Sequence, residues 1–171
     1  VATAADLSWQ MVLVDLPGVQ KPRDVLTSRM QKRVERELKD SDAVLFVLNG
    51  EQGIGPGDLF IASMLEAARP EAPVICAVNK IDRLKHGHVA TQMKTAATLG
   101  DFHALHPVSA VTKDGVAELR DDLVHLLPEG PLYFPLDQST DLTTENRVAE
   151  VIREKALHLT RDEVPHAIMV V

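Results

Sequence analysis

The stretch VICAVNKID, residues 74–82, joins an apolar run to a polar tetrapeptide. The apolar run, residues 73–79, predicts a strand buried on both faces, as in a parallel sheet that is covered by helices. Asn79, Lys80 and Asp82 follow where this strand ends. Because ligands of open α/β sheets bind outside the carboxyl ends of the strands, the tetrapeptide is a candidate ligand-binding loop.

Strands and helices are predicted to alternate on either side of this stretch. Apolar runs of strand length separate segments whose apolar residues recur every three or four positions. The alternating segments are residues 11–15, 24–41, 43–49, 59–69, 73–79, 88–99, 102–109 and 115–127. These lengths indicate βαβ units, so we predict an α/β fold with a parallel sheet and helices on both of its faces.

The composition changes at Pro128. Residues 128–146, PEGPLYFPLDQSTDLTTEN, are rich in turn formers and have no helical period, so a linker is predicted over residues 128–141. A helix over residues 146–159 and a strand over residues 164–171 are predicted to follow. One helix and one strand cannot close a hydrophobic core, so these residues are expected to begin a second domain.

The overall composition is that of an ordinary globular protein. The 171 residues carry a net charge of −7, which makes the chain as a whole a poor non-specific binder of nucleic acid. No apolar run approaches the roughly 18–20 residues of a membrane span, and no secretory signal is visible. Cys76 is the one cysteine, so no internal disulfide and no disulfide-linked partner are expected, and its apolar neighbours predict a core residue.

Asp82 has the chemistry to select guanine over adenine. Guanine presents two adjacent donors, N1–H and the N2 amino group, and a carboxylate offers two matching acceptors. Adenine would leave that carboxylate unpaired, and a site with unmade polar bonds discriminates strongly. Asn79 is a candidate for bonding the opposite base edge or bracing the loop, and the stem of Lys80 for covering the base plane. The alternative is a polar loop in which Asp82 caps a helix.

Two further predicted strand ends carry candidate site residues. Asp15 is suited to hold a magnesium ion, usually through water, and Gly18 allows a backbone N–H to approach a phosphate. Ser109 and Ala110 are suited to turn their N–H groups toward a base oxygen. Taken alone, each pair is more readily explained as a simple turn. A shared sheet edge with Asn79 favours the functional interpretation.

D-L-P-G at residues 15–18, N-K-I-D at residues 79–82 and V-S-A at residues 108–110 occur in an order and spacing that resemble translation-factor-class GTPases. The linker sharpens this resemblance, because it and the residues after it are similar to the junction and early RNA-binding domain of the Era family of bacterial GTPases. The specific stretches are DQSTD (137–141), AEVIREK (149–155) and EVPH (163–166). The resemblance covers essentially the whole chain.

The resemblance implies a P-loop NTPase (Ras-like) fold, a three-layer α/β/α domain over residues 1–127. The linker 128–141 would join it to the start of a type II KH domain, of α+β class, over residues 142–171. The implied cofactors are GTP or GDP and Mg2+, with Asp15 holding the metal through water. The implied nucleotide-binding residues are Asp15, Leu16, Pro17, Gly18, Val19, Asn79, Lys80, Ile81, Asp82, Ser109, Ala110 and Val111.

The resemblance also implies partners and a location. The KH domain would bind 16S ribosomal RNA, and the GTPase would act in assembly of the 30S ribosomal subunit. A cytoplasmic protein is implied. Peripheral contact with the inner face of the cell membrane is a family association, and no basic amphipathic helix in the sequence adds support to it.

The chain departs from the family pattern in several places. The phosphate-binding G-x-x-x-x-G-K-[ST] is absent: Gly50 and Gly55 have the glycine spacing, but Pro56 stands where Lys is required. Val19 occupies the position at which Ras-type enzymes place a water-orienting Gln, so no catalytic residue is assigned. The G-x-x-G loop of a KH domain is missing from residues 142–171. We therefore expect missing segments at both ends, and poor GTP binding and hydrolysis by this chain alone.

Two alternatives stay open. Another bacterial ribosome-assembly GTPase, or a tRNA-modification GTPase, would share the nucleotide motifs but would not follow the last helix with this linker and the EVPH strand. A nucleotide-free RNA-interaction module would keep the sheet only to present an RNA-binding segment.

Overall fold

The computed structural model divides the chain into two compact units, one formed by residues 1–12 and 132–171 and the other by residues 13–131. The residues that the structure describes are 2–4, 8–16, 34, 36–68, 71–85, 87–136, 148–149 and 151–152. The helix predicted over residues 146–159 is described only at its four residues in these ranges, which are helical, and the strand predicted over residues 164–171 lies outside them.

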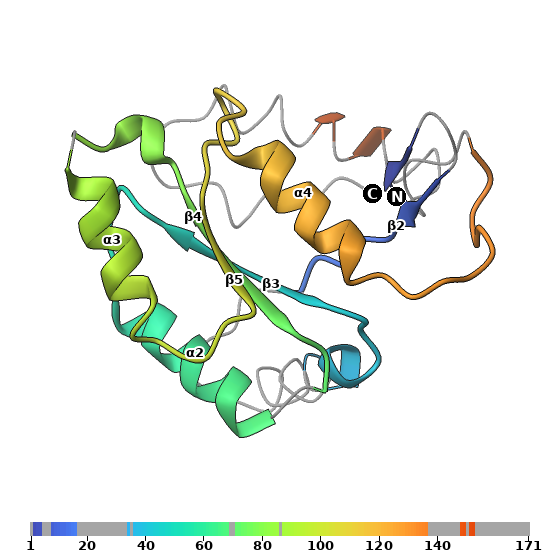
Figure 1. The fold of residues 1–171 in the computed structure, drawn as a ribbon, viewed down its shortest axis with the longest axis horizontal. Helices are drawn as coiled ribbons and strands as arrows, with labels where there is room; N and C mark the ends of the chain where they lie inside the picture. The colour runs from blue at the N-terminus through green and yellow to red at the C-terminus, as the bar shows by residue number, and fades with distance from the viewer. Residues whose placement is uncertain are drawn as a thin grey trace. The chain divides into compact units, whose positions relative to one another are not determined.

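The larger unit is built on a parallel sheet (Figure 1). Strands β3 (Val44–Asn49), β4 (Val74–Asn79) and β5 (Ala104–Pro107) lie in the order β3-β4-β5, and both pairs are parallel. Asn49 and Asn79 are level with each other in the register, so the carboxyl ends of these two strands coincide. The predicted α/β architecture with a parallel sheet is therefore confirmed.

Helices connect these strands, as a parallel sheet requires. They are α2 (Pro56–Ala68) and α3 (His88–Ala96), with a 3-10 turn, η1 (Ile81–Arg83), after β4, while α4 (Val116–His125) follows β5. In the predicted helix 24–41, Val34 and residues 36–39 are helical and residues 24–33 lie outside the described residues.

Helix α2 begins earlier than predicted. Pro56 occupies the first helical position, which suits proline because the missing N–H has no helical partner there. Asp58 lies within the first turn, and its Oδ2 accepts a hydrogen bond from the N–H of Gly55 at 2.8 Å. The carboxylate therefore caps the helix from inside its first turn, as in one half of a capping box.

The core lies on one face of the sheet. Phe46, Leu48 and Cys76 point to this face, where they pack with buried residues of α2 and α3. Ile75 of β4 points to the opposite face and is also fully buried, so β4 is covered on both sides as predicted. Cys76 is a core residue, as predicted, with no exposed surface.

Strand β3 is well covered on one face and only partly on the other, although helices are predicted on both faces of the sheet. Val47 is 52% exposed, while Phe46 and Leu48 on either side of it are buried. Helix α4 packs against β5, and β4 lies between β5 and β3 in the sheet. Among the described residues, no helix packs over Val47. An apolar run therefore did not reveal that one face of this strand lacks cover.

The strand predicted over residues 11–15 is wrong in its extent and its pairing. The strand β2 comprises only Gln10–Met11, and it pairs antiparallel with β1, Ala2–Thr3, in the smaller unit. Val12, Leu13 and Val14 are exposed by 44%, 64% and 59%. These residues have no sheet neighbour in the described structure, and without one a strand cannot pair its backbone groups.

In the smaller unit, the side chain of Gln10 bonds to the backbone after residue 131. Its Oε1 accepts hydrogen bonds from the N–H groups of Tyr133 and Phe134, and its Nε2 donates to the carbonyl of Phe134, each at 3.0 Å. These bonds connect β2 with part of the predicted linker. In the part of the chain that the structure describes, no helix is long and apolar enough to cross a membrane.

Candidate functional site

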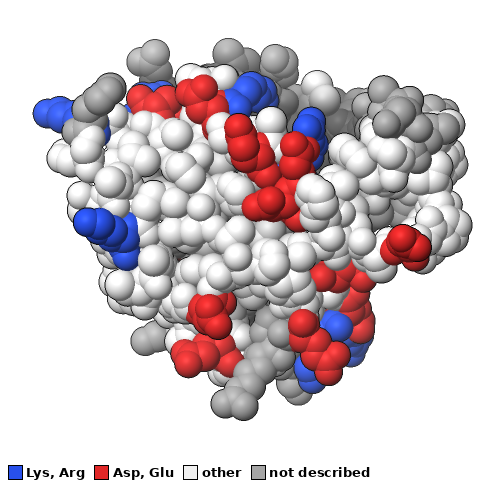
Figure 2. Space-filling model, in the orientation of Figure 1, with Lys and Arg blue, Asp and Glu red and all other residues white. Residues whose placement is uncertain are grey.

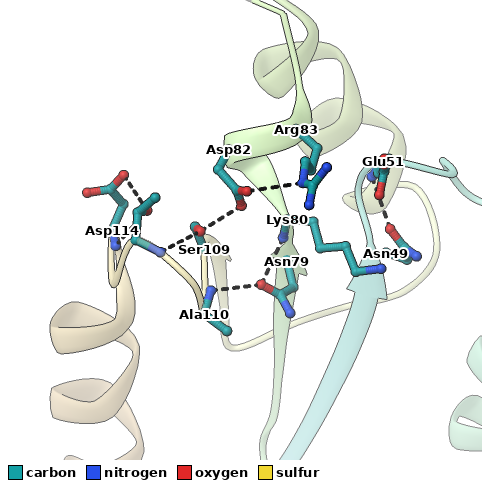
Figure 3. Close-up of polar contacts among 10 residues, drawn as sticks. Asn49, Glu51, Asn79, Lys80, Asp82, Arg83, Ser109, Ala110 and Asp114 are labelled. Atoms are coloured by element: carbon teal, nitrogen blue, oxygen red, sulfur yellow. Dashed lines mark hydrogen bonds and ion pairs between the residues drawn. The ribbon is translucent and has the colours of Figure 1, made fainter. Parts of the chain in front are cut away.

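The loops after β4 and β5 lie side by side at the carboxyl edge of the sheet (Figure 3). The N–H of Val108 donates to the carbonyl of Val78 at 2.9 Å, and the N–H of Ile81 donates to the carbonyl of Val108 at 3.2 Å. These backbone bonds continue the pairing of the two strands beyond the sheet. The predicted meeting of Asn79–Asp82 with Ser109–Ala110 is therefore observed.

The side chain of Asn79 ties these two loops together. Its Oδ1 accepts a hydrogen bond from the N–H of Lys80 at 2.8 Å and another from the N–H of Ala110 at 3.1 Å. Lys80 has a left-handed backbone with φ of 67°. Such a conformation costs a residue with a side chain about 1–2 kcal/mol. The bond from Asn79 helps to hold Lys80 in it.

Asp82 is oriented by Ser109. The hydroxyl of Ser109 donates to Oδ1 of Asp82 at 2.6 Å and accepts from the N–H of Thr112 at 3.1 Å. Ser109 has no exposed surface, and the side chain of Asp82 is 19% exposed. Oδ2 of Asp82 lies 3.5 Å from Nε of Arg83, a largely exposed side chain. A carboxylate accepts several hydrogen bonds, so Asp82 keeps acceptor capacity for a ligand.

Asn49 and Gly50 form a third part of this edge, although neither is among the predicted site residues. Oδ1 of Asn49 accepts from the N–H groups of Glu51 and Gln52 at 3.1 and 3.4 Å. The N–H of Gly50 donates to the carbonyl of Asn79 at 2.8 Å, and a Cβ on Gly50 would lie 2.9 Å from that oxygen. The signal that could have found them is the position of Asn49, at the end of an apolar strand next to β4.

The remaining predicted site residues differ in their exposure, and some of them lie outside the described residues. Val111 follows Ala110 and is 79% exposed. Asp15 is exposed, and no described residue forms a hydrogen bond or ion pair with it. Leu16 is half-buried and packs against the core of the larger unit. Pro17, Gly18 and Val19 lie outside the described residues.

Comparison with known proteins assigns the chain to a family. A family model for the GTP-binding domain of elongation factor Tu matches residues 8–129. The chain therefore belongs to the family of GTP-binding domains typified by elongation factor Tu, and its α/β sheet is that of a P-loop GTPase.

Within that family the chain is similar to the GTPase Era. It is 39% identical over 163 residues to Era of Clostridium botulinum, covering 95% of the chain and 54% of that protein. It is 40% identical over 162 residues to Era of Clostridium kluyveri, covering 95% of the chain and 55% of that protein. The resemblance to the Era family is thus confirmed. The chain spans about half the length of the curated relatives it matches.

Two solved Era structures share the fold. One is Era in complex with MgGDPNP and nucleotides 1506–1542 of 16S ribosomal RNA, with a TM-score of 0.78 and 32% identity over 90% of this chain and 52% of that one. The other is a variant of Aquifex aeolicus Era bound to GDP.AlF4-, with a TM-score of 0.75 and 33% identity over 88% of this chain and 51% of that one.

Proposed function

We propose that this chain is part of an Era-type GTPase, in which the loops after β4 and β5 bind the guanine base. The observation that carries this proposal is the pair of bonds that joins them: Ser109 to Asp82, and Ala110 to Asn79. The bonds fix the carboxylate and the loop backbone before a nucleotide arrives. A preorganised site loses less free energy on binding than one that must order its side chains.

Asp82 would read the base. Its carboxylate accepts from N1–H and the N2 amino group of guanine, and it holds the bond from Ser109 at the same time. Lys80 would cover the base plane with its stem, and Ile81 and Val111 would contribute contacts along the same loops. An adenine base has no amino group at this edge, and it would leave a charged acceptor unpaired.

Asp15 to Val19 would serve the phosphate end of the nucleotide. An exposed carboxylate suits a magnesium ion that keeps most of its waters and takes further ligands from the phosphates, and Asp15 fits that description. The described residues contain no group of three or more His, Cys, Asp or Glu that could hold a metal by themselves. When bound, the ion would neutralise charge on the phosphates.

The proposed RNA partner follows from the relatives. Era is solved in complex with nucleotides 1506–1542 of 16S ribosomal RNA. We propose that the whole protein binds the same RNA through a domain that begins near residue 142, and that it acts in 30S subunit assembly. We propose that the protein is cytoplasmic and that, by association with its family, it contacts the inner face of the membrane peripherally.

The change Asp82→Asn in the whole protein tests the base-reading role. The amide loses an acceptor for guanine but donates to the C2 carbonyl of xanthine, so we expect GTP affinity to fall about 10- to 100-fold and XTP affinity to rise. Competition binding with both nucleotides measures this. The exposed Asp42→Asn is the matched control. If Asp82→Asn keeps its preference for GTP, Asp82 does not read the base.

The same experiment separates the proposal from a nucleotide-free module. That alternative is favoured by one observation, the absence of G-x-x-x-x-G-K-[ST] from these 171 residues. A nucleotide-free module would bind neither GTP nor XTP before or after the change, while RNA binding by the whole protein would persist.

A further inference from the structure

A surface hollow of about 820 Å³ lies at the edge of the sheet opposite to the base-binding loops. It is bounded by the later part of α2, the start of β4 at Val74 and the loop that runs from α3 to β5 through His103. Strand β4 has six residues, so roughly 20 Å of strand separates this edge from the loop at Asn79. The hollow is therefore distinct from the candidate nucleotide site.

The floor of the hollow is apolar and held in place by the core. Leu65 of α2 is buried, and Leu99 and Phe102 are half-buried members of the lining. The ring of Phe102 packs on the core residue Phe46 with ring centroids 6.3 Å apart. The N–H of His103 donates to the carbonyl of Val74 at 2.8 Å, which fixes the loop to β4. The floor is thus preformed, as a docking site for an apolar side chain requires.

The rim of the hollow is acidic. Glu66, Glu71 and Asp101 come from three separate segments, all are exposed, and no described basic side chain is paired with them. Among the described residues that line the hollow there is no Lys or Arg. Figure 2 shows red side chains without a blue neighbour toward the lower margin of the view, left of centre, where α2 runs in Figure 1.

We propose that this hollow docks a basic segment of a partner protein, which places one apolar or aromatic side chain on the floor and Lys or Arg against the rim. Charge complementarity selects this occupant, because three carboxylates favour a cationic segment. They disfavour RNA, whose phosphates they repel. An apolar anchor surrounded by charged contacts is the usual arrangement of a small protein interface. The proposal does not depend on nucleotide binding, since the two sites lie at opposite edges.

Peptide binding to the whole protein tests this docking site. The probe is a fluorescent synthetic peptide in which one Phe is flanked by Lys and Arg, and a second peptide carries Glu in place of every Lys and Arg. We expect the basic peptide to bind more weakly as salt rises, and the acidic peptide not to bind. Backbone amide NMR signals of Leu99, Phe102 and His103 are expected to shift on binding.

A pair of charge-matched variants locates the peptide. The triple change Glu66→Gln, Glu71→Gln and Asp101→Asn is expected to weaken binding of the basic peptide about tenfold. The control triple Glu51→Gln, Glu118→Gln and Glu129→Gln alters the net charge equally at exposed positions outside the hollow, and it is expected to change binding less than about twofold. Exposed neutral substitutions preserve the fold, which thermal unfolding of both variants verifies.

Three results would overturn the proposal. Equal loss in both triple variants would mean that the peptide senses only overall charge. Binding of the acidic peptide as tightly as the basic peptide would mean that the carboxylates of the rim do not select a basic segment. Complete displacement by spermidine, together with unchanged affinity when the Phe of the peptide is replaced by Gly, would mean that the hollow collects free polycations and docks no protein segment.

Discussion

Ser109 is the residue on which the geometry of the candidate base site depends most directly. It is fully buried, and its hydroxyl both donates to Asp82 and accepts from Thr112. Because the buried hydroxyl both donates and accepts a hydrogen bond, its orientation is fixed. The orientation of the Asp82 carboxylate, which accepts from it, is therefore also fixed. Sequence reasoning placed Ser109 at the correct edge but could not assign this bond, because its partner is 27 residues away.

Removing this hydroxyl should weaken nucleotide binding more than it weakens the fold. Ser109→Ala deletes a charge-assisted bond worth about 1.5–3 kcal/mol, so we expect GDP affinity of the whole protein to fall about tenfold or more. Ser63→Ala is the control, since its exposed hydroxyl bonds only to the carbonyl of Phe60 in α2. Fluorescent GDP titration and urea unfolding measure the two effects. Equal GDP affinity in both variants would contradict the positioning role.

Cys76 gives a pH-dependent prediction. Burial raises the pKa of its thiol from an ordinary 9.0 to about 12. The folded state therefore keeps a proton that the unfolded state releases above pH 9, so stability is unaffected below pH 9 and falls as pH rises from about 9 to about 12.

The contribution of Cys76 to that decline is about 1.4 kcal/mol per pH unit. Urea unfolding between pH 8 and about pH 11 should show a shallower decline for Cys76→Ala than for the natural chain, after subtraction of their difference at pH 8. Iodoacetamide at pH 8 should label Cys76 only after unfolding, because the thiol is fully buried. Parallel pH profiles in the two proteins would contradict the assignment.

At the scale of the elements, the junction between β5 and α4 relies on one glycine. Gly115 precedes α4 with φ of 69°, and a Cβ at this position would overlap the carbonyl oxygen of Pro107. Gly87 precedes α3 with φ of 89° but has open space around it. Gly57, in the first turn of α2, has neither constraint.

Three Gly→Ala variants should therefore separate the cost of a left-handed backbone from the cost of steric overlap with the new Cβ. Gly57→Ala is expected to be neutral or stabilising by about 0.4–1 kcal/mol, and Gly87→Ala to destabilise by about 1–2 kcal/mol. Gly115→Ala must also displace backbone, so it should cost clearly more than Gly87→Ala. Urea unfolding of the three variants measures the order. An equal loss of unfolding free energy in Gly87→Ala and Gly115→Ala would show that the backbone at Pro107 moves away from the new Cβ at no cost in stability.

The sequence predicts a strand and its burial correctly where the apolar pattern of the strand matches its packing in the fold. β4 is apolar from Val74 to Val78 and is buried on both faces, so its sequence and its environment coincide. β3 is equally apolar, but Val47 is exposed because cover depends on which helix packs beside it. Residues 11–15 are strand-like in composition, yet composition cannot supply a pairing partner. The local pattern predicts the three strands of the parallel sheet, whereas the exposure of Val47 and the pairing of β2 depend on tertiary contacts.

At the scale of the whole molecule, the positions of the charged side chains are more informative than the net charge of the chain. The net charge of −7 argues only against non-specific nucleic-acid binding. The acidic rim of the hollow is formed by Glu66, Glu71 and Asp101, and β4 and α3 separate Asp101 from the other two in sequence. No local pattern predicts that they meet, because their proximity follows from the packing of α2 beside the loop between α3 and β5.

The 171 residues by themselves should bind GTP only weakly, because they include the proposed base-reading loops but no G-x-x-x-x-G-K-[ST] sequence. Base contacts alone supply about 4 kcal/mol or less, so we expect a Kd weaker than about 1 mM and no measurable hydrolysis by residues 1–171. Titration with fluorescent GTP and a phosphate-release assay measure both, with Asp15→Ala as the matched variant. Turnover by the natural chain that is lost in Asp15→Ala would show that these residues hold the phosphates without G-x-x-x-x-G-K-[ST].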